Sequence, residues 1–365
     1  MKVRFFSVSE FDLLLKSIER LWGKNHIYCR NPELLKYMVY NTPYRKQVTT
    51  DNNTTFIGLF DGNKVVGLSG MMPQMANIFG KKVLSTTGTI WIVDKDYKLE
   101  GLELLKYLLS FKPGLHVGPG INTKVKKLYK MLKWETFDDF PRWIGTSNVE
   151  KLEKSFNITN KFLLKNLESI ELLDSQNYVF NDTLDKDRWD EFYNKRFAKK
   201  TIGTARDFEF LNWRYIDYPF FDYKLISLST VAKEYKGLVI YRVENIEIDG
   251  KKAQIGRILE IIYDDLNEGI RLVQHMINAE NNILFWDFYC LSSVTALALE
   301  YIGFRRLPSS ENEKYIPTRF HPVDYEVMNI QGTIYIDEKI KKSLNLVIDQ
   351  QWYVTRGDGD QDRPN

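Results

Sequence analysis

The sequence contains one pattern twice, and this internal repeat restricts the fold more than any other feature of the chain. The segment RNPELLKYMVYNTPY, which begins at Arg30, matches RDFEFLNWRYIDYPF, which begins at Arg206, in its Arg, Glu, Leu and Pro residues. Three more pairs of markers are each 170 positions apart: Gly67 and Gly237, Gly80 and Gly250, and Trp134 and Phe304. We therefore predict two copies of one fold in a single chain.

The length of 365 residues agrees with two domains. We predict that the first copy covers residues 1–150 and the second covers 178–310. A connector would span residues 151–177, and residues 311–365 would form a C-terminal extension.

Each copy shows the same order of elements. An amphipathic helix is followed by a short helix that ends before Pro43 or Pro219. β-rich runs follow, and in the first copy the turn residues Asp61, Gly62 and Asn63 predict a hairpin. A strand, a helix, a second strand and a last helix complete the unit. This order predicts an α+β fold in which each copy is a mixed, mostly antiparallel sheet flanked by helices.

Composition and charge exclude several classes of protein. The chain has 51 basic and 48 acidic residues and a net charge of +3, which argues against nucleic acid or a membrane surface as the main partner. No apolar run approaches the roughly 18 residues of a spanning helix, and the first residues lack the features of a signal peptide. Two distant cysteines and four scattered histidines give no zinc spacing. We expect a soluble, cytoplasmic protein without a metal.

The stretch HVGPGINTKVKKLYKMLKW, from His116 to Trp134, has an unusual spacing. A short strand runs into a Gly-Pro-Gly turn, an Asn follows, and the next helix carries lysines on one side and Tyr129 on its apolar side. A core-facing aromatic is the ordinary interpretation of Tyr129, because Val125, Leu128 and Leu132 share its face.

This stretch resembles the GNAT family of acyl-CoA N-acyltransferases, in which Asn-x-x-Ala-x-x-Leu-Tyr-x-x-x-Gly-Phe follows a strand. Asn122, Leu128, Tyr129 and Trp134 are in register with that motif, whereas Val125 and Lys133 depart from it. The resemblance covers most of the chain and implies two tandem GNAT-like domains. It also implies that Asn122 satisfies pantetheine amides and that Tyr129 protonates the departing CoA thiolate.

The first half of the family motif, Arg/Gln-x-x-Gly-x-Gly/Ala, corresponds to KLEGLELL after the strand TIWIVD. Lys98 and Gly101 match, but Glu103 stands where Gly or Ala is expected, and an ordinary strand-to-helix turn remains an alternative. In the family, backbone N–H groups and the helix dipole hold the CoA pyrophosphate at this turn. The lysines of the last helix are ordinarily interpreted as a solvated face. The resemblance implies that they supply positive charge for the 3′-phosphate of CoA. The implied cofactor-binding residues are Ile92, Val93, Lys98, Leu99, Gly101, Leu102 and Lys126.

The second copy lacks these features. Ser292 replaces the Asn and Leu299 replaces the Tyr, and no glycine-rich turn precedes them. We expect acyl-CoA to bind only the first copy, and the second to bind the acceptor or serve as a scaffold.

Three residues are candidates for binding the acceptor in a cleft between the copies. Trp213 could stack on a base, and Arg214 could hold a diphosphate through two hydrogen bonds. Arg257 is either an anion contact or a paired arginine beside Glu260. The alternatives are a core position for Trp213 and a surface ion pair for Arg214.

The tail WYVTRGDGDQDRPN is charged and glycine-containing, and such ends are commonly disordered. It resembles the ends of tandem GNAT proteins from sugar-modifying pathways. On that resemblance Asp358, Asp360 and Asp362 fold back toward the acceptor.

No general base is evident. His116 lies on the strand that enters the slot, and Asp94 ends the neighbouring strand. A hydrogen-bonded core histidine is the alternative for His116, and a chain of waters could also take the proton of the amine.

The resemblance implies an enzyme that transfers an acyl group, 3-hydroxybutyryl or acetyl, from acyl-CoA to the amine of a nucleotide-linked amino-deoxysugar. The nearest group acts on dTDP-3-amino-3,6-dideoxygalactose for surface polysaccharide such as the lipopolysaccharide O-antigen. An aminoacyl-tRNA-dependent transferase of peptidoglycan bridges and a non-catalytic GNAT-fold binding protein are the alternatives. A homo-oligomer is left open.

Overall fold

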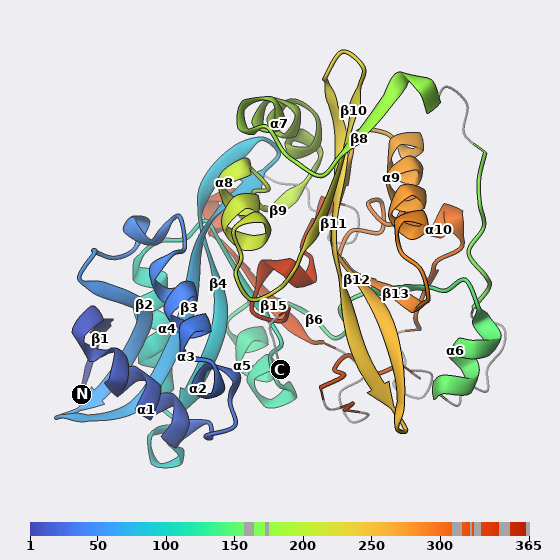
Figure 1. Ribbon diagram of the computed structural model, residues 1–365. Coiled ribbons are helices and arrows are strands. Elements are labelled where there is room, and N and C mark those ends of the chain that lie inside the picture. Colours follow the sequence, from blue (N-terminus) through green and yellow to red (C-terminus); the bar gives the residue numbers. More distant parts are fainter. Residues whose placement is uncertain are drawn as a thin grey trace.

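The computed structural model describes residues 1–156, 164–171, 175–308, 316–321, 323–324, 330–342 and 351–362. Within these residues the strands form two sheets that stand side by side (Figure 1). In spatial order, the first sheet contains β1 (Lys2–Ser7), β2 (Asn53–Asp61), β3 (Lys64–Ile78), β4 (Lys81–Val93), β5 (Leu115–Pro119), β15 (Gly332–Ile336) and β6 (Glu135–Phe137), with β9 (Ile202–Thr204) paired to β3. The second contains β14 (Arg305–Arg306), β7 (Arg142–Gly145), β13 (Ile283–Tyr289), β12 (Lys251–Tyr263), β11 (Tyr235–Ile248), β10 (Lys224–Thr230) and β8 (Tyr178–Asn181).

Helices cover the sheets. The helices around the first sheet are α1 (Phe11–Leu21), α2 (Ile27–Arg30), α3 (Pro32–Tyr40), α4 (Gly101–Ser110), α5 (Thr123–Met131) and α11 (Glu338–Lys342). Those around the second are α6 (Val149–Phe156), α7 (Lys186–Phe192), α8 (Phe208–Leu211), α9 (Leu266–Ala279) and α10 (Leu297–Ile302). π-helical turns extend α7 over Tyr193–Phe197 and α8 over Asn212–Ile216.

Successive side chains of a strand point to opposite faces of the sheet, so the two faces of the first sheet pack against different layers of helices. Phe5 of β1 packs in the cluster that contains Leu104 and Leu108 of α4. Its neighbour Phe6 points to the other face and packs in the cluster of α1 and α3. The same cluster continues into the second copy, so one large core joins the two halves of the molecule.

The two sheets repeat each other residue by residue. Ser85 of β4 pairs with Leu115 of β5, and Ile255 of β12 pairs with Phe285 of β13, 170 positions later in each case. Backbone turns with positive φ recur at the same separation: Phe79 and Asp249, Gly80 and Gly250, Lys112 and Asn282, and Lys133 and Gly303. The predicted α+β fold with two similar copies is confirmed.

The two copies exchange one strand. β7 follows β6 along the chain, but it pairs with β13 and β14 in the second sheet. Its equivalent place in the first sheet, between β5 and β6, is taken by β15 from the predicted C-terminal extension. The sheets therefore depart from the predicted boundaries at three strands. Residues 142–145 complete the second sheet, whereas residues 332–336 and 202–204 belong to the first.

This exchange makes β15 part of the core of the first copy. We expect Ile334→Ala to lower the free energy of unfolding by about 2–5 kcal/mol, because Ile334 is buried and its truncation leaves a cavity. Lys339→Ala, at an exposed position in the same extension, is the control. Urea unfolding of the whole chain measures both, and equal midpoints for the two variants would contradict an integral β15.

Candidate functional site

The candidate site is a slot between two parallel strands that pair only briefly. β4 and β5 are in register at three positions, from Ser85 and Leu115 to Thr87 and Val117. Beyond these positions β4 continues to Val93, and no described strand pairs with that edge. The strands therefore separate around a cavity of about 110 Å³, which residues of β4, β5, α4 and α5 line. The predicted catalytic residues Asn122, Tyr129 and His116 all lie in this lining.

A β-bulge marks the point where the slot opens. The register of β3 and β4 changes after Ser69, so Thr89 and Ile90 both lie opposite Gly70. Glycine is required at that position, because a Cβ atom on Gly70 would lie 2.3 Å from Oγ1 of Thr89. The bulge therefore depends on a close approach that only glycine permits.

The open edge of β4 presents backbone groups to the slot. The N–H of Asp94 donates to the carbonyl of Val66 in β3, at 2.8 Å. Since successive residues of a strand direct their backbone groups to opposite sides, Trp91 and Val93 turn theirs to the slot and Ile92 turns its own to β3. Of the two predicted β4 residues, Val93 rather than Ile92 offers its N–H.

Two side-chain atoms of β4 are buried without a partner. Among the described residues, neither Oγ1 of Thr89 nor Nε1 of Trp91 has a hydrogen bond, and both residues line the slot. An unpaired buried polar group costs about 1–3 kcal/mol. The slot is therefore suited to a ligand that carries polar groups.

Tyr129 enters the slot from α5. Its ring packs between those of Trp91 and Trp134, with ring centroids 5.7 Å and 4.8 Å away. Burial raises the pKa of its hydroxyl above the usual value, so the group is a neutral donor at physiological pH. Tyr129 is thus a core aromatic, as its helical position suggests, and it also faces the slot.

Asn122 and Lys126 have partners within their own region. Oδ1 of Asn122 caps α5 by accepting the N–H of Val125 at 2.9 Å, which leaves its amide nitrogen for other contacts. The ammonium group of Lys126 bonds to Asp138.

The N-terminus of α4 lies at the end of β4. Gly101 is its first residue, and a Cβ atom there would lie 3.0 Å from a methyl group of Val93, so glycine lets the helix start close to the strand. Leu99 is 86% exposed, and Glu103 turns outward to Lys106 at 2.6 Å. The backbone N–H groups of Leu99, Gly101 and Leu102 have no acceptor within the described part of the chain. Together with Lys98 in the preceding turn, they form a region suited to an anion.

His116 is buried at the closed end of the slot. Burial lowers its pKa to about 4, so the ring is neutral at physiological pH. Its Nδ1 lies 2.7 Å from Oγ1 of Thr86, and Nε2 lies 3.4 Å from the place of a Cβ atom on Gly88. His116 is therefore a hydrogen-bonded core histidine that also lines the slot. Asp94, the other candidate base, pairs with Arg20 at 3.3 Å and with Lys64 at 3.8 Å.

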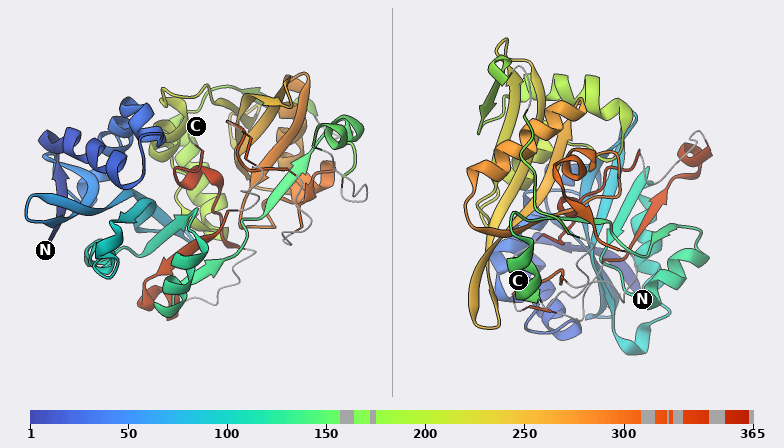
Figure 2. Two further views of the ribbon diagram at one scale, coloured as in Figure 1. Left: turned by 90° about the horizontal axis from the view of Figure 1, so that it is seen from below. Right: turned by 90° about the vertical axis from the view of Figure 1, so that its right-hand side faces the viewer.

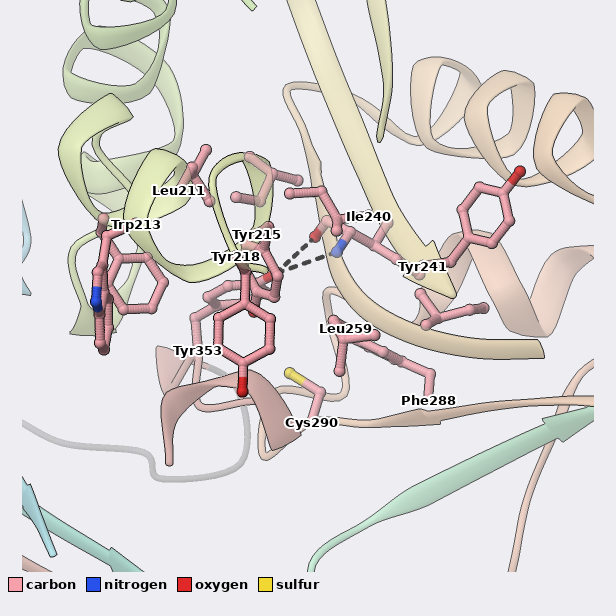
Figure 3. Packing of buried hydrophobic residues seen from close by; sticks show 14 of the residues in the cluster. Leu211, Trp213, Tyr215, Tyr218, Ile240, Tyr241, Leu259, Phe288, Cys290 and Tyr353 are labelled. Carbon is pink, nitrogen blue, oxygen red and sulfur yellow. Dashed lines mark hydrogen bonds between the residues drawn. The ribbon is translucent and has the colours of Figure 1, made fainter. Parts of the chain in front are cut away.

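The equivalent slot in the second copy is filled by the chain itself. Ile261 of β12 occupies the position 170 residues after Trp91. Its N–H donates to the hydroxyl of Tyr353 at 3.1 Å, and its carbonyl oxygen lies 3.2 Å from the same hydroxyl (Figure 3). That hydroxyl also lies 2.7 Å from Oε2 of Glu260. Tyr353 of the tail thus forms hydrogen bonds with the backbone groups of Ile261, whose equivalents on Trp91 in the first copy face the slot.

The tail continues between the two sheets (Figure 2). Arg206, fully buried, donates to both carboxylate oxygens of Asp358 at 2.9 and 2.8 Å and to Glu260 at 2.8 Å. Arg242 donates to Asp362 at 2.8 Å. Burial alone would raise the pKa of Asp362, but the charge and hydrogen bonds of Arg242 hold it below its usual value. Residues 355–362 are therefore ordered by buried ion pairs; residues 363–365 of the tail lie outside the described part of the chain.

The structure places Trp213, Arg214 and Arg257 around the tail and the core rather than at the slot. Trp213 is buried, and its ring lies parallel to that of Tyr37 with centroids 6.3 Å apart. Arg214 donates to the carbonyl oxygens of Gly357, Gly359 and Asp362 in the tail. Arg257 is buried between Glu244 and Asp287. Their roles in acceptor binding stay predictions.

Gly359 and Gln361 of the tail lie against Pro119, which lines the slot. The hydroxyl of Tyr28 donates to Asp360 at 3.3 Å. A Cβ atom on Gly359 would lie 2.8 Å from the ring of Pro119, and Nε2 of Gln361 lies 3.4 Å from the carbonyl oxygen of Pro119, at the end of β5.

The sequence analysis did not identify Trp91 or Trp22 as residues of the slot, or Tyr353 as the residue that fills the second slot. Trp91 in TIWIVD could have been identified from the sequence. It lies on the strand that leads to the predicted CoA turn, and a buried indole N–H needs a hydrogen-bond acceptor. The helical spacing of apolar residues would place Trp22 on the buried face of α1, yet it is 51% exposed and lines the slot. Nothing in the local sequence indicated the place of Tyr353.

Among the described residues, no cluster of three or more His, Cys, Asp or Glu could hold a metal ion. None of the helices in the described part of the chain is long and apolar enough to cross a membrane.

Comparison with solved structures identifies the fold. A GCN5-related N-acetyltransferase from Anabaena variabilis ATCC 29413 is similar with a TM-score of 0.52 and 15% identity, over 85% of this chain and 73% of that one. One from Kribbella flavida has a TM-score of 0.51 and 13% identity, over 84% and 71%. N-myristoyltransferase of Saccharomyces cerevisiae, solved with bound myristoyl-CoA, has a TM-score of 0.50 and 11% identity, over 91% and 82%. No protein-family model and no curated protein matches the sequence. The chain therefore has two GNAT-like sheets in an α+β fold.

The buried ion pairs of the tail give a test of its role in stability. We expect Asp358→Ala to lower the free energy of unfolding by about 3 kcal/mol, because it leaves the buried charge of Arg206 with one carboxylate instead of two. Asp187→Ala, at an exposed position in the first turn of α7, is the control. If denaturant unfolding gives both variants the stability of the parent chain, the tail is not anchored as described.

Proposed function

We propose that this protein is an acyl-CoA-dependent N-acyltransferase that acylates the amine of a nucleotide-linked amino-deoxysugar, with dTDP as the nucleotide and 3-hydroxybutyryl or acetyl as the acyl group. The observation that carries this proposal is the slot of the first copy. Its open strand edge, helix N-terminus and buried Tyr129 supply the contacts that an acyl thioester needs. The likeness to N-acetyltransferases and to a transferase solved with bound myristoyl-CoA supports acyl-CoA as the donor.

The donor would lie along the open edge of β4. The N–H groups at the start of α4 would bind the pyrophosphate of CoA, because a helix N-terminus favours negative charge. The pantetheine arm carries amides that can pair with the backbone of Trp91 and Val93. The thioester carbonyl would meet N–H groups near the bulge, which stabilise the negative charge that develops on its oxygen.

The chemistry is a direct transfer. The neutral amine attacks the thioester carbon, a C–N bond forms and the C–S bond breaks. The proton of the Tyr129 hydroxyl goes to the departing sulfur, and the proton released from the amine returns through water. Since the pKa of His116 is about 4, its ring provides hydrogen bonds rather than an efficient base at neutral pH.

The sugar acceptor rests on the resemblance of the sequence to tandem proteins of sugar-modifying pathways. The placement of Gln361 of the tail beside the slot is compatible with it, since an aminosugar presents hydroxyl groups that an amide can bind. A cytoplasmic location and a role in surface polysaccharide follow from the same proposal.

The activity is tested with purified protein, 3-hydroxybutyryl-CoA or acetyl-CoA, and dTDP-3-amino-3,6-dideoxygalactose. Release of free CoA thiol and a product heavier by one acyl group are expected only when the aminosugar is present. Transfer of the aminoacyl group from an aminoacyl-tRNA to a peptidoglycan-precursor peptide without CoA, or no thiol release with the aminosugar, would refute the sugar transferase.

Tyr129→Phe should lower kcat by about 10²–10⁴-fold, because it removes the proton donor for the thiolate. The KM for acyl-CoA should change little, since the ring keeps its packing between Trp91 and Trp134. Tyr107→Phe on α4 is the matched control, because its ring packs away from the slot against Phe5 and Phe111. A Tyr129→Phe enzyme with the parent kcat and unchanged thermal stability would return Tyr129 to a purely structural role.

A further inference from the structure

Trp22 is placed unusually for a large aromatic side chain. It follows the last residue of α1 and is 51% exposed, yet it lines the same cavity as Tyr129, Asn122 and His116. Leaving this much of an indole in water forgoes apolar burial worth roughly 25 cal/mol for each Å². An indole that is exposed inside a cavity, rather than on a convex surface, is a candidate for covering by a ligand.

A row of aromatic rings runs from Trp22 to the C-terminal tail. The centroid of the Trp22 ring lies 5.3 Å from that of His26, and the rings meet edge to face. The His26 ring lies 5.0 Å from that of Tyr28. The Tyr28 hydroxyl then donates to Asp360 at 3.3 Å. Trp22 is therefore held from one side, and its outer part remains available.

The tail forms the neighbouring part of the slot's rim. The side chain of Gln361 lies against Gly120, where a Cβ atom would be only 2.4 Å from Nε2 of Gln361. Gly120 and Pro119 line the cavity together with Trp22. The rim thus has an aromatic surface on the α1 side and the amide of Gln361 on the tail side.

This rim lies on the face of the sheet opposite to α4 and α5. Gln74 of β3 donates to the carbonyl oxygen of Asp358 and accepts from Thr87 of β4, so the tail packs on that face. The proposed CoA contacts at the start of α4 lie on the other face. A second substrate can therefore approach the open edge of β4 from the Trp22 side without crossing the donor.

We propose that Trp22 is the platform for the acceptor, a pyranose that carries an amine. In this arrangement the apolar face of the sugar ring packs on the exposed indole and the amine points into the slot toward the bulge. The side-chain amide of Gln361 binds its hydroxyl groups. This inference rests on the proposed transfer to an aminosugar and replaces Trp213 with Trp22 as the stacking residue. Trp22 is thus assigned to acceptor specificity and not to the binding of acyl-CoA.

The inference is tested by steady-state kinetics of Trp22→Ala and Trp22→Phe with acetyl-CoA and dTDP-3-amino-3,6-dideoxygalactose. Trp22→Ala should raise the KM for the aminosugar at least about tenfold, and Trp22→Phe should recover part of the loss. The KM for acetyl-CoA should change by less than about twofold, because the donor contacts lie on the other face. Tyr301→Ala is the matched control, since Tyr301 is 57% exposed on α10 of the second copy.

A spectroscopic measurement keeps the test independent of turnover. With CoA present, addition of the aminosugar should change the tryptophan fluorescence of the parent chain, and this change should be lost in Trp22→Phe. A parent enzyme that acylates the sugar while Trp22→Ala keeps its acceptor KM would overturn the platform and leave the proposed function intact. An effect of Trp22→Ala on the KM for acetyl-CoA alone would also overturn it. Absence of any transfer by the parent enzyme would instead remove the proposed function and this inference with it.

Discussion

The buried charge of Arg206 is the interaction on which the arrangement of the molecule depends. A fully buried guanidinium must be neutralised, because an unpaired charge in the interior is far more costly than a paired one. The two carboxylates that neutralise it are Glu260 of β12 and Asp358 of the tail. This cluster fixes the tail against the second sheet, and the residues on either side of Asp358 then have little freedom. Tyr353 enters the second slot, and residues 359–361 lie at the rim of the first.

The same fold is therefore used in two ways. In the first copy the strand edge beyond the bulge is open and Tyr129 faces it. In the second copy Leu299 stands at the position of Tyr129, and Tyr353 occupies the backbone groups of Ile261. The exchange of β7 and β15 joins the copies further, because each sheet is completed by a strand from a distant part of the chain. The second copy thus contributes a support for the tail, and the tail contributes part of the rim of the open slot.

Much of the fold was predictable, because repeated local patterns specify repeated local structure. The repeat at 170 positions, the α+β class and the strand–turn–helix around Asn122 all follow from residues close together in the sequence. The exchange of strands was not predictable in this way. RWIG and GTIYI indicate strands, but a strand pattern does not specify which sheet it joins.

Residues of the site could be predicted only where the motif that identifies them lies within one short stretch of sequence. The motif around Tyr129 brought three predicted residues to one cavity. Trp213 and Arg214 look like ligand groups in the sequence, but an aromatic and an arginine also suit a buried contact with a tail. Tyr37, which stacks on Trp213, and the tail carbonyl groups that bind Arg214 are more than 140 positions away in the chain. Trp22 was missed because the last turn of an amphipathic helix does not reveal which of its apolar residues stays uncovered.

The central claim is that the chain has one open slot for a CoA thioester and one that its own tail fills. Titration calorimetry of the full chain with CoA tests this most directly, because it counts bound molecules without any assumption about the acceptor. The account predicts saturable binding of one CoA per chain. Binding of two CoA molecules per chain would contradict the filling of the second slot by Tyr353. Absence of binding at millimolar CoA would contradict the first slot as a CoA site.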